Sequence, residues 1–139
     1  MSQNNNDLLE TTLLGFTDMV NQFLEALTEL GPECTGIKDY ILKIDLAINN
    51  AIDAGAKRKA MESLIQRYHN SVKPIYARCA NRDPTVFTEC DIEFLQPIGL
   101  REKWLDGGID DDCRDCIWEY VLEMNRYSQL YEGLFRKIP

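Results

Sequence analysis

The sequence predicts an all-α fold: a single-domain bundle of four to six helices with long first and last helices. Two observations support this prediction. Apolar residues recur at alternating steps of three and four along most of the chain, which is the spacing of one helix face. No two segments show the alternation that would make a convincing strand pair. A chain of 139 residues can bury one core of its own. We expect residues 1–6 to be a flexible polar N-terminus and residues 7–139 to be a single helical domain.

The first long helix is predicted between the polar lead SQNNN and the dipeptide Gly31–Pro32. Glycine adopts the left-handed cap conformation readily and proline cannot continue the helical hydrogen bonds, so the pair marks an end. A helix of about 24 residues would be roughly 36 Å long. Its apolar stripe consists of Leu9, Leu13, Phe16, Val20, Phe23, Leu27 and Leu30.

Two further helices are predicted in the first half of the chain. The second should stop near Gly55, and its stripe consists of isoleucines, for which the helical period outweighs the strand preference of β-branched residues. The third should run from about Lys57 to Cys79, with a break or kink at Pro74, which removes a backbone hydrogen bond and clashes with the preceding turn. The stripe of the second helix is Ile37, Ile41, Ile44, Ile48 and Ile52.

The segment 81–109 is predicted to be mostly irregular, because it holds two prolines and three glycines and has no long periodic run. Short helices are expected from about Pro84 and across Leu100–Leu105. The last long helix should begin within residues 110–113 and reach about Phe135. Its predicted inner face is Cys113, Ile117, Tyr120, Met124, Tyr127 and Tyr131, with Trp118, Val121 and Leu122 beside it.

Charge is distributed unevenly along the chain. The net charge of −8 repels nucleic acid on average, yet residues 57–82 carry seven cations against Glu62 alone. These cations could neutralise phosphates, or they could be matched by the acidic first helix, within one fold or between two copies. The acids of residues 1–33, which include no Lys or Arg, are Asp7, Glu10, Asp18, Glu25, Glu29 and Glu33. The candidate basic interaction face is Lys57, Arg58, Lys59, Arg67, Lys73, Arg78 and Arg82.

The chain lacks the signals of a membrane or secreted protein. It has no run of 18 apolar residues, so no transmembrane helix is expected. Its start has neither the positive charge nor the apolar centre of a secretory signal, which predicts an intracellular setting. An odd number of cysteines disfavours a disulfide framework, so we expect reduced thiols. The five cysteines are Cys34, Cys79, Cys90, Cys113 and Cys116.

The segment DGGIDDDCRDCIWEY, residues 106–120, contains a Cys-x-x-Cys pair among acids. A zinc site needs two more ligands, a redox site is disfavoured by the acids around both thiols, and the segment has a glycine and an isoleucine where a calcium loop needs oxygen ligands. We favour a turn at Gly107 and Gly108 followed by a helix that one residue of Asp110–Asp112 caps. Cys113 and Cys116 then lie on or near the apolar face as small hydrophobic residues.

The sequence offers no motif for catalysis. Its one histidine, His69, has no serine or cysteine marked as a partner, and no glycine-rich phosphate-binding pattern occurs. We therefore expect a protein that is not an enzyme and that binds no metal and no cofactor.

Three segments carry a family resemblance that covers nearly the whole chain: FTDMVNQFLEALTELGPE, YHNSVKPIYARCANRDPTVF and LREKWLDGGIDDDCRDCIWEYVLEMNRYSQLY. In order and spacing they resemble small helical proteins of undetermined function encoded by nucleocytoplasmic large DNA viruses of the phycodnavirus, mimivirus and marseillevirus kind. The resemblance implies a protein made in the host cytoplasm, acting in the viral factory or packaged in the virion. It implies no catalytic residues.

Taken together, these features predict a non-enzymatic interaction protein. Its expected partner is a viral or host protein, or a second copy of itself in a homo-oligomer. The alternative is a nucleic-acid-binding accessory protein that uses the basic residues of the third helix. No membrane association is expected.

Overall fold

The computed structural model describes residues 2–28, 35–90, 100–105, 107 and 109–137. Within these ranges the chain is helical without a strand, and the first and last helices are the longest, so the predicted fold class is confirmed. The elements in chain order are α1 (Ser2–Leu27), α2 (Thr35–Ile44), the π-helical turn η2 (Asp45–Asn49), α3 (Ala54–Val72), the 3₁₀ turn η3 (Lys73–Ile75), α4 (Tyr76–Ala80), α5 (Thr85–Thr88), α6 (Leu100–Leu105) and α7 (Asp111–Lys137).

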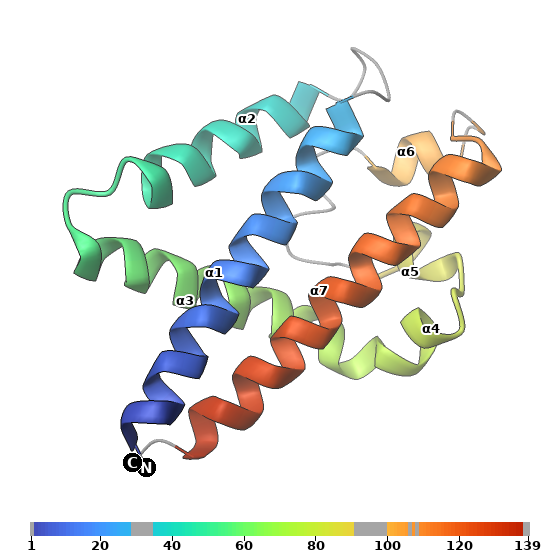
Figure 1. Cartoon of the computed structure of the whole chain (residues 1–139). Coiled ribbons are helices and arrows are strands. Elements are labelled where there is room, and N and C mark those ends of the chain that lie inside the picture. Colours follow the sequence, from blue (N-terminus) through green and yellow to red (C-terminus); the bar gives the residue numbers. More distant parts are fainter. Residues whose placement is uncertain (1, 29–34, 91–99, 106, 108, 138–139) are drawn as a thin grey trace.

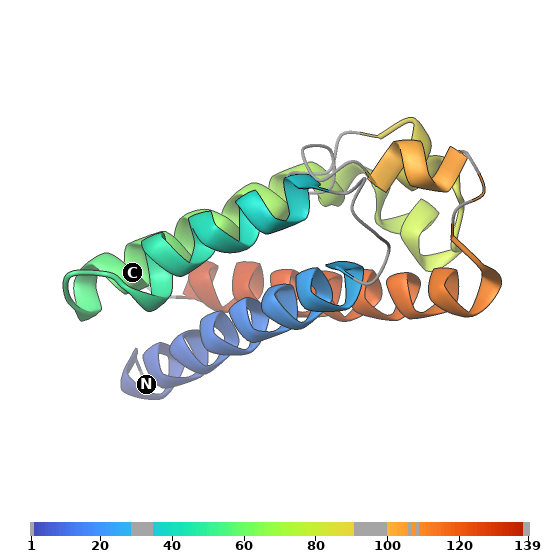
Figure 2. The ribbon, with the colours of Figure 1, turned by 90° about the horizontal axis from the view of Figure 1, so that it is seen from above.

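The long helices form two layers. Helices α1 and α7 lie side by side and antiparallel in one layer, and α2, η2 and α3 form the second layer above them (Figures 1 and 2). Helix α3 crosses over both long helices of the first layer, which places its middle turns at the centre of the molecule (Figure 1). The short helices α4, α5 and α6 gather around the first turns of α7 (Figures 1 and 2).

The apolar stripe of α1 is the centre of the core. Its residues from Leu9 to Leu27 are buried as predicted, and Leu24 joins them. The predicted stop at Gly31–Pro32 and the last stripe residue, Leu30, lie outside the described residues. The helix begins at Ser2, so the polar lead that we expected ahead of the helix is part of it.

The second predicted helix ends earlier than the sequence suggested, in a π-helical turn. The Asn50 backbone N–H donates to the Asp45 carbonyl five residues back at 2.8 Å, and the Asn49 side-chain amide donates to the Asp45 carboxylate at 2.7 Å. The chain then turns, and Asp53 caps α3 by accepting from the Ala56 N–H at 2.8 Å. Ile52 lies in this turn with 96% of its surface exposed, so its predicted place on the buried stripe is wrong.

The proline break in the third helix is confirmed. Helix α3 stops at Val72, the 3₁₀ turn η3 contains Pro74, and α4 resumes at Tyr76. The two predicted short helices are also present, as α5 directly after Pro84 and as α6.

A cluster of aromatic side chains packs α5 and α6 against α7. The Phe87 ring centroid lies 4.5 Å from that of Trp104 and 4.6 Å from that of Trp118, and all three side chains are buried. The Arg114 guanidinium covers the Trp104 ring at 4.8 Å. The tryptophans are therefore core residues and are not available as surface anchors.

The inner face of α7 is rotated from the predicted one. Asn125 and Ser128 are buried beside Val121 and Met124, while Tyr120 and Tyr127, which we expected on this face, are only half-buried. Apolar periodicity does not mark asparagine and serine as core residues. The predicted inner face of α7 was therefore displaced toward the tyrosines.

Gly15 allows α1 and α7 to approach closely. A Cβ atom at this position would lie 2.6 Å from Cε1 of the Tyr127 ring, which is closer than van der Waals contact permits. An alanine in a helix is normally more stable than a glycine by about 1 kcal/mol. Here that gain is opposed because the Tyr127 ring must move.

We expect Gly15→Ala to destabilise the protein, or to leave its stability unchanged, in the wild-type background, and to stabilise it by about 1 kcal/mol in a Tyr127→Ala background. Urea denaturation of the four proteins of this cycle measures the difference. Equal stabilisation in both backgrounds would show that the ring does not oppose the methyl group.

Candidate functional site

The strongest candidate site is the α2 arm, which we define as residues 36–52. One side of the arm covers the core through Ile37, Ile44 and Ile48. A second side faces α3 across a groove, and a third side faces outward. Both of these other sides carry features that the packing of the core does not require.

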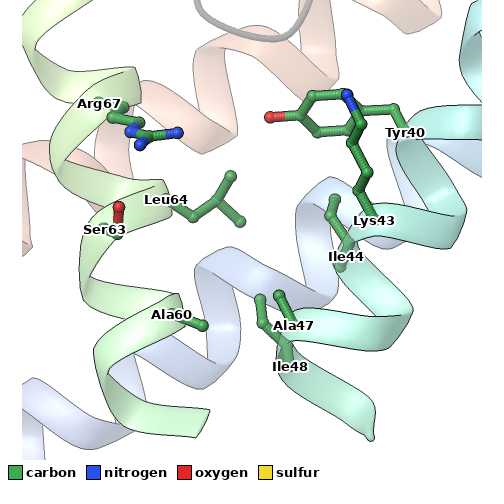
Figure 3. Close-up of a pocket in the computed structure, with 9 residues that line it drawn as sticks. All are labelled: Tyr40, Lys43, Ile44, Ala47, Ile48, Ala60, Ser63, Leu64 and Arg67. Atoms are coloured by element: carbon green, nitrogen blue, oxygen red, sulfur yellow. The ribbon is translucent and has the colours of Figure 1, made fainter. Parts of the chain in front are cut away.

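The groove between the α2 arm and α3 has a volume of about 400 Å³ (Figure 3). Small-molecule sites in proteins usually have volumes of about 300–1,000 Å³. The residues that line it from the arm are Tyr40, Lys43, Ile44, Ala47 and Ile48, and those from α3 are Ala60, Ser63, Leu64 and Arg67.

The groove is polar at one end and apolar at the other. Figure 3 shows the Arg67 guanidinium and the Tyr40 hydroxyl on opposite walls, pointing toward one another, with the Lys43 ammonium group beside the Tyr40 ring. Leu64 points from α3 toward the arm below them. The far end is formed by the small side chains Ala47 and Ala60 and by the isoleucine of η2.

The charge of the groove is opposite to that of the whole protein. Two of its described lining residues are cations and none is an acid, although the chain has a net charge of −8.

The wall of the groove includes the π-helical turn. Ala47 and Ile48 belong to η2 and line the apolar end. This π turn ends the helix that α2 begins, so it determines where the apolar end of the groove closes and the chain turns toward α3.

The outer side of the arm exposes large apolar side chains. Leu42 and Leu46 are one helical turn apart and are 57% and 61% exposed, and Ile52 at the tip of the arm is 96% exposed. Exposed charged residues neighbour them in the chain, Lys38, Asp39, Lys43 and Asp45. An apolar centre with a polar rim is the usual composition of a protein interface.

The candidate basic face is spread over several elements. Lys57 and Lys59 are two residues apart on α3, so their side chains point to different sides of that helix. Arg67 lines the groove, whereas Lys57 lines a separate depression against α1 with Asp18. Arg58 also lies on α3, and the other three members, Lys73, Arg78 and Arg82, lie on η3, on α4 and in the turn after it.

Acidic and polar neighbours contact several of these cations. Nε of Arg58 lies 3.9 Å from a Glu62 carboxylate oxygen, and Nη1 of Arg82 lies 3.3 Å from one of Asp115. Arg78 donates to the Cys90 sulfur at 3.5 Å. The basic face stays a prediction, and its geometry does not favour a single stripe for a phosphate backbone.

We therefore expect no retardation of a short DNA duplex or single strand in a gel-shift titration, even at low salt, where phosphate contacts are strongest. A shift at low salt that disappears on adding salt and on changing Arg67 to Glu would instead support the nucleic-acid alternative.

The single histidine belongs to a buried polar cluster between α3, α4 and α7. Tyr76 connects it, because the Tyr76 hydroxyl lies 2.9 Å from Nδ1 of His69 and 3.0 Å from the Ser128 hydroxyl. Ser128 in turn donates to the Asn125 carbonyl at 3.0 Å. No sequence pattern predicted this cluster, because Ser128 is 52 residues from Tyr76 in the chain. Ser128 is fully buried, so its hydroxyl is not presented to a substrate.

The charge state of His69 is set chiefly by burial. Burial lowers the pKa of His69, the Glu132 carboxylate opposes this by raising it, and Lys73 and Arg136 lower it further. The other ring nitrogen, Nε2, is buried and has no hydrogen-bond partner in the described part of the chain. It lies 3.8 Å from a Glu132 carboxylate oxygen. The folded protein thus favours the neutral imidazole.

Because the folded state binds the His69 proton less tightly than the unfolded state, protonation favours unfolding. We expect the stability due to this group to be complete above the ordinary pKa of 6.5 and to be lost as the pH falls below that value toward the lowered one. Proton NMR of the single histidine measures its pKa directly, and His69→Asn should flatten the stability profile between about pH 7 and 5. A histidine pKa at or above 6.5 would contradict this prediction.

The Cys-x-x-Cys segment is a helix start, as predicted. Asp110 caps α7 by accepting from the Cys113 N–H at 2.8 Å, and Gly107 has a positive φ of 77° in the preceding turn. Cys113 packs against the core, but Cys116 is exposed, so its predicted place near the apolar face is wrong. Position 116 lies five residues into the helix, outside the apolar stripe. Across the described residues, no three His, Cys, Asp or Glu side chains are grouped as metal ligands would be.

Comparisons with known proteins give no relative: no family model, no curated protein and no solved structure matches the chain. Among the helices that the structure describes, none has the length and apolar character needed to cross a membrane.

Proposed function

We propose that the protein is a non-enzymatic interaction module that binds a partner protein through the outer side of the α2 arm. The observation that carries the proposal is the exposure of Leu42, Leu46 and Ile52 on an arm whose inner side already covers the core. Folding of the single chain leaves these side chains in water, so burying them against a partner is favourable by about 25 cal/mol per Å² of apolar surface.

The spacing of the leucines suits a helical partner. Residues four apart lie one above the other on a helix, and a facing helix packs its side chains between them. The partner is a viral or host protein or a second copy of the chain. The sequence resemblance supports placing this interaction in the host cytoplasm, at the viral factory or in the virion.

Photocrosslinking tests the proposal at the level of single residues. A photoreactive phenylalanine analogue is placed at Leu46, and in a matched control at Gln129, an exposed residue on α7. We expect crosslinked products from infected cells only with the Leu46 probe. Mass spectrometry identifies the partner, and a product of twice the chain mass identifies self-association.

Binding of the purified partner then provides the quantitative test. We expect Leu42→Glu combined with Leu46→Glu to weaken binding at least tenfold without lowering thermal stability, because both side chains are exposed. Leu8→Glu, at another exposed leucine on α1, is the matched control and should change binding less than twofold. Equal weakening of binding by Leu8→Glu and by the double variant would refute the assignment of the partner site to the outer side of the arm. So would a double variant that binds as tightly as the wild type.

A further inference from the structure

We propose that the partner of the α2 arm is a second copy of this chain, bound through the same outer side, with the two arms antiparallel about a two-fold axis beside Leu42. The inference rests on the proposed function, because it names the partner of that outer side. Helix α2 lies at one edge of the molecule, so a second copy can reach it (Figure 1).

The charges of the outer side are balanced, although those of the whole protein are not. The chain has a net charge of −8, yet the arm carries two lysines and two aspartates, all of them exposed: Lys38, Asp39, Lys43 and Asp45. A two-fold interface brings the same patch of both copies together, so each cation needs an anion within that patch. A patch of one sign would repel itself, whereas this patch can pair with its own copy.

The four charges lie on two flanks of the exposed leucines. Successive residues of a helix are about 100° apart around its axis, since one turn takes about 3.6 residues. Lys38 and Asp45 therefore lie on one flank of Leu42, at about 40° and 60° from it. Asp39 and Lys43 lie on the other flank, at about 60° and 100° from Leu42. Each flank thus has one cation and one anion.

The order of the charges along the arm matches an antiparallel pair. When two copies of a helix pack antiparallel about a two-fold axis, each flank faces the same flank of the other copy in reverse order. The midpoint between Lys38 and Asp45 lies between residues 41 and 42, and the midpoint between Asp39 and Lys43 lies at residue 41. One axis therefore aligns both pairs, and because symmetry repeats each pair, four ion pairs form around the two Leu42 side chains.

The size of the contact predicts a weak dimer. Residues 35–49 of α2 and η2 form roughly 20 Å of helix that is about 10 Å across, so each copy buries roughly 300–500 Å² in this contact. Stable interfaces bury about 800 Å² on each copy, so this contact belongs to the weak class. We expect a dissociation constant of about 10–100 µM.

Sedimentation equilibrium of the purified chain tests for self-association. We expect a reversible equilibrium between monomer and dimer, with the dimer predominant at about 500 µM. Leu42→Glu, which places two like charges at the two-fold axis, should raise the dissociation constant at least tenfold. Leu8→Glu, at an exposed leucine of α1, is the matched control and should change it less than twofold.

Two charge-exchange variants test the antiparallel arrangement. Both keep the net charge of the wild type, and both retain the Asp45 carboxylate that accepts from the Asn49 amide in η2. Exchange within a flank, Asp39→Lys with Lys43→Asp, keeps a cation opposite an anion, so the dissociation constant should change less than threefold. Exchange between flanks, Lys38→Asp with Asp39→Lys, places like charges opposite one another in all four pairs and should raise it at least tenfold. Thermal denaturation verifies that both variants are folded.

Three results would overturn the inference. A wild-type chain that stays monomeric at about 500 µM would remove the second copy as the partner. Equal dissociation constants for the two exchange variants would show that the charges of the two arms do not face one another. Loss of the dimer in the within-flank variant alone would show parallel arms, in which opposite flanks meet.

The crosslinking test of the proposed function has separate outcomes. If the chain is monomeric and the Leu46 probe still gives a product with another protein, the proposed function stands and this inference fails. If a dimer forms but is insensitive to Leu42→Glu, the copies associate through another face, and this inference fails as well. If neither a dimer nor any product of the Leu46 probe is found, both fail.

Discussion

Replacing Phe16 with alanine is expected to lower the free energy of unfolding by about 3–5 kcal/mol, the usual cost of deleting a buried aromatic ring. Phe16 is fully buried on α1, and its ring centroid lies 5.4 Å from that of Tyr68 on α3. The residue therefore joins the two layers at the point where α3 crosses. A typical domain is stable by only about 5–15 kcal/mol, so this variant should lose a large share of its stability.

Phe135→Ala is the matched control for this loss. Phe135 is 45% exposed near the end of α7, where its ring stacks on Tyr131 at 5.7 Å. We expect this variant to lose about 1 kcal/mol or less. Denaturant titrations of both variants measure the difference, and equal losses would contradict the described packing of α1 against α3.

The apolar period of the sequence was sufficient to predict the fold class and the main helices. It identified six buried residues of α1 between Leu9 and Leu27 but not Leu24, and proline chemistry located the break at Pro74. It failed where local geometry departs from a regular α-helix. The π turn at Asp45–Asn49 and the turn after it moved Ile52 from the expected stripe to the surface.

Much less of the candidate site than of the fold could be predicted from the sequence. The groove depends on how the arm lies against α3, and neither Lys43 nor Tyr40 stands out in a helical pattern. The basic residues of 57–82 suggested one face, but helical spacing separates Lys57, Lys59 and Arg67 onto different sides of α3. Charge clustering in sequence therefore located one of the two groove cations and said nothing of the other.

Buried polar residues could not be predicted from the apolar period. The second large effect on stability is expected from two of them. The Tyr68 hydroxyl donates to the Asn125 side-chain oxygen at 2.6 Å, and both residues are buried at the contact between α3 and α7. Burial raises the pKa of Tyr68 well above its ordinary value, so the phenol keeps its proton and remains a donor. Removing one partner leaves the other without its bond inside the core.

We expect Asn125→Leu alone to lower the free energy of unfolding by about 2–3 kcal/mol, because the buried Tyr68 hydroxyl loses its 2.6 Å hydrogen bond to the Asn125 side chain. Adding Tyr68→Phe should recover about 1 kcal/mol, since the buried hydroxyl that lost its Asn125 acceptor is then gone. Two independent packing losses would add, so the double variant would then be less stable than Asn125→Leu. We expect the double variant to be the more stable of the two. Urea denaturation of the two single variants and the double variant distinguishes these cases, and additive losses would show that the Tyr68–Asn125 bond does not couple α3 to α7.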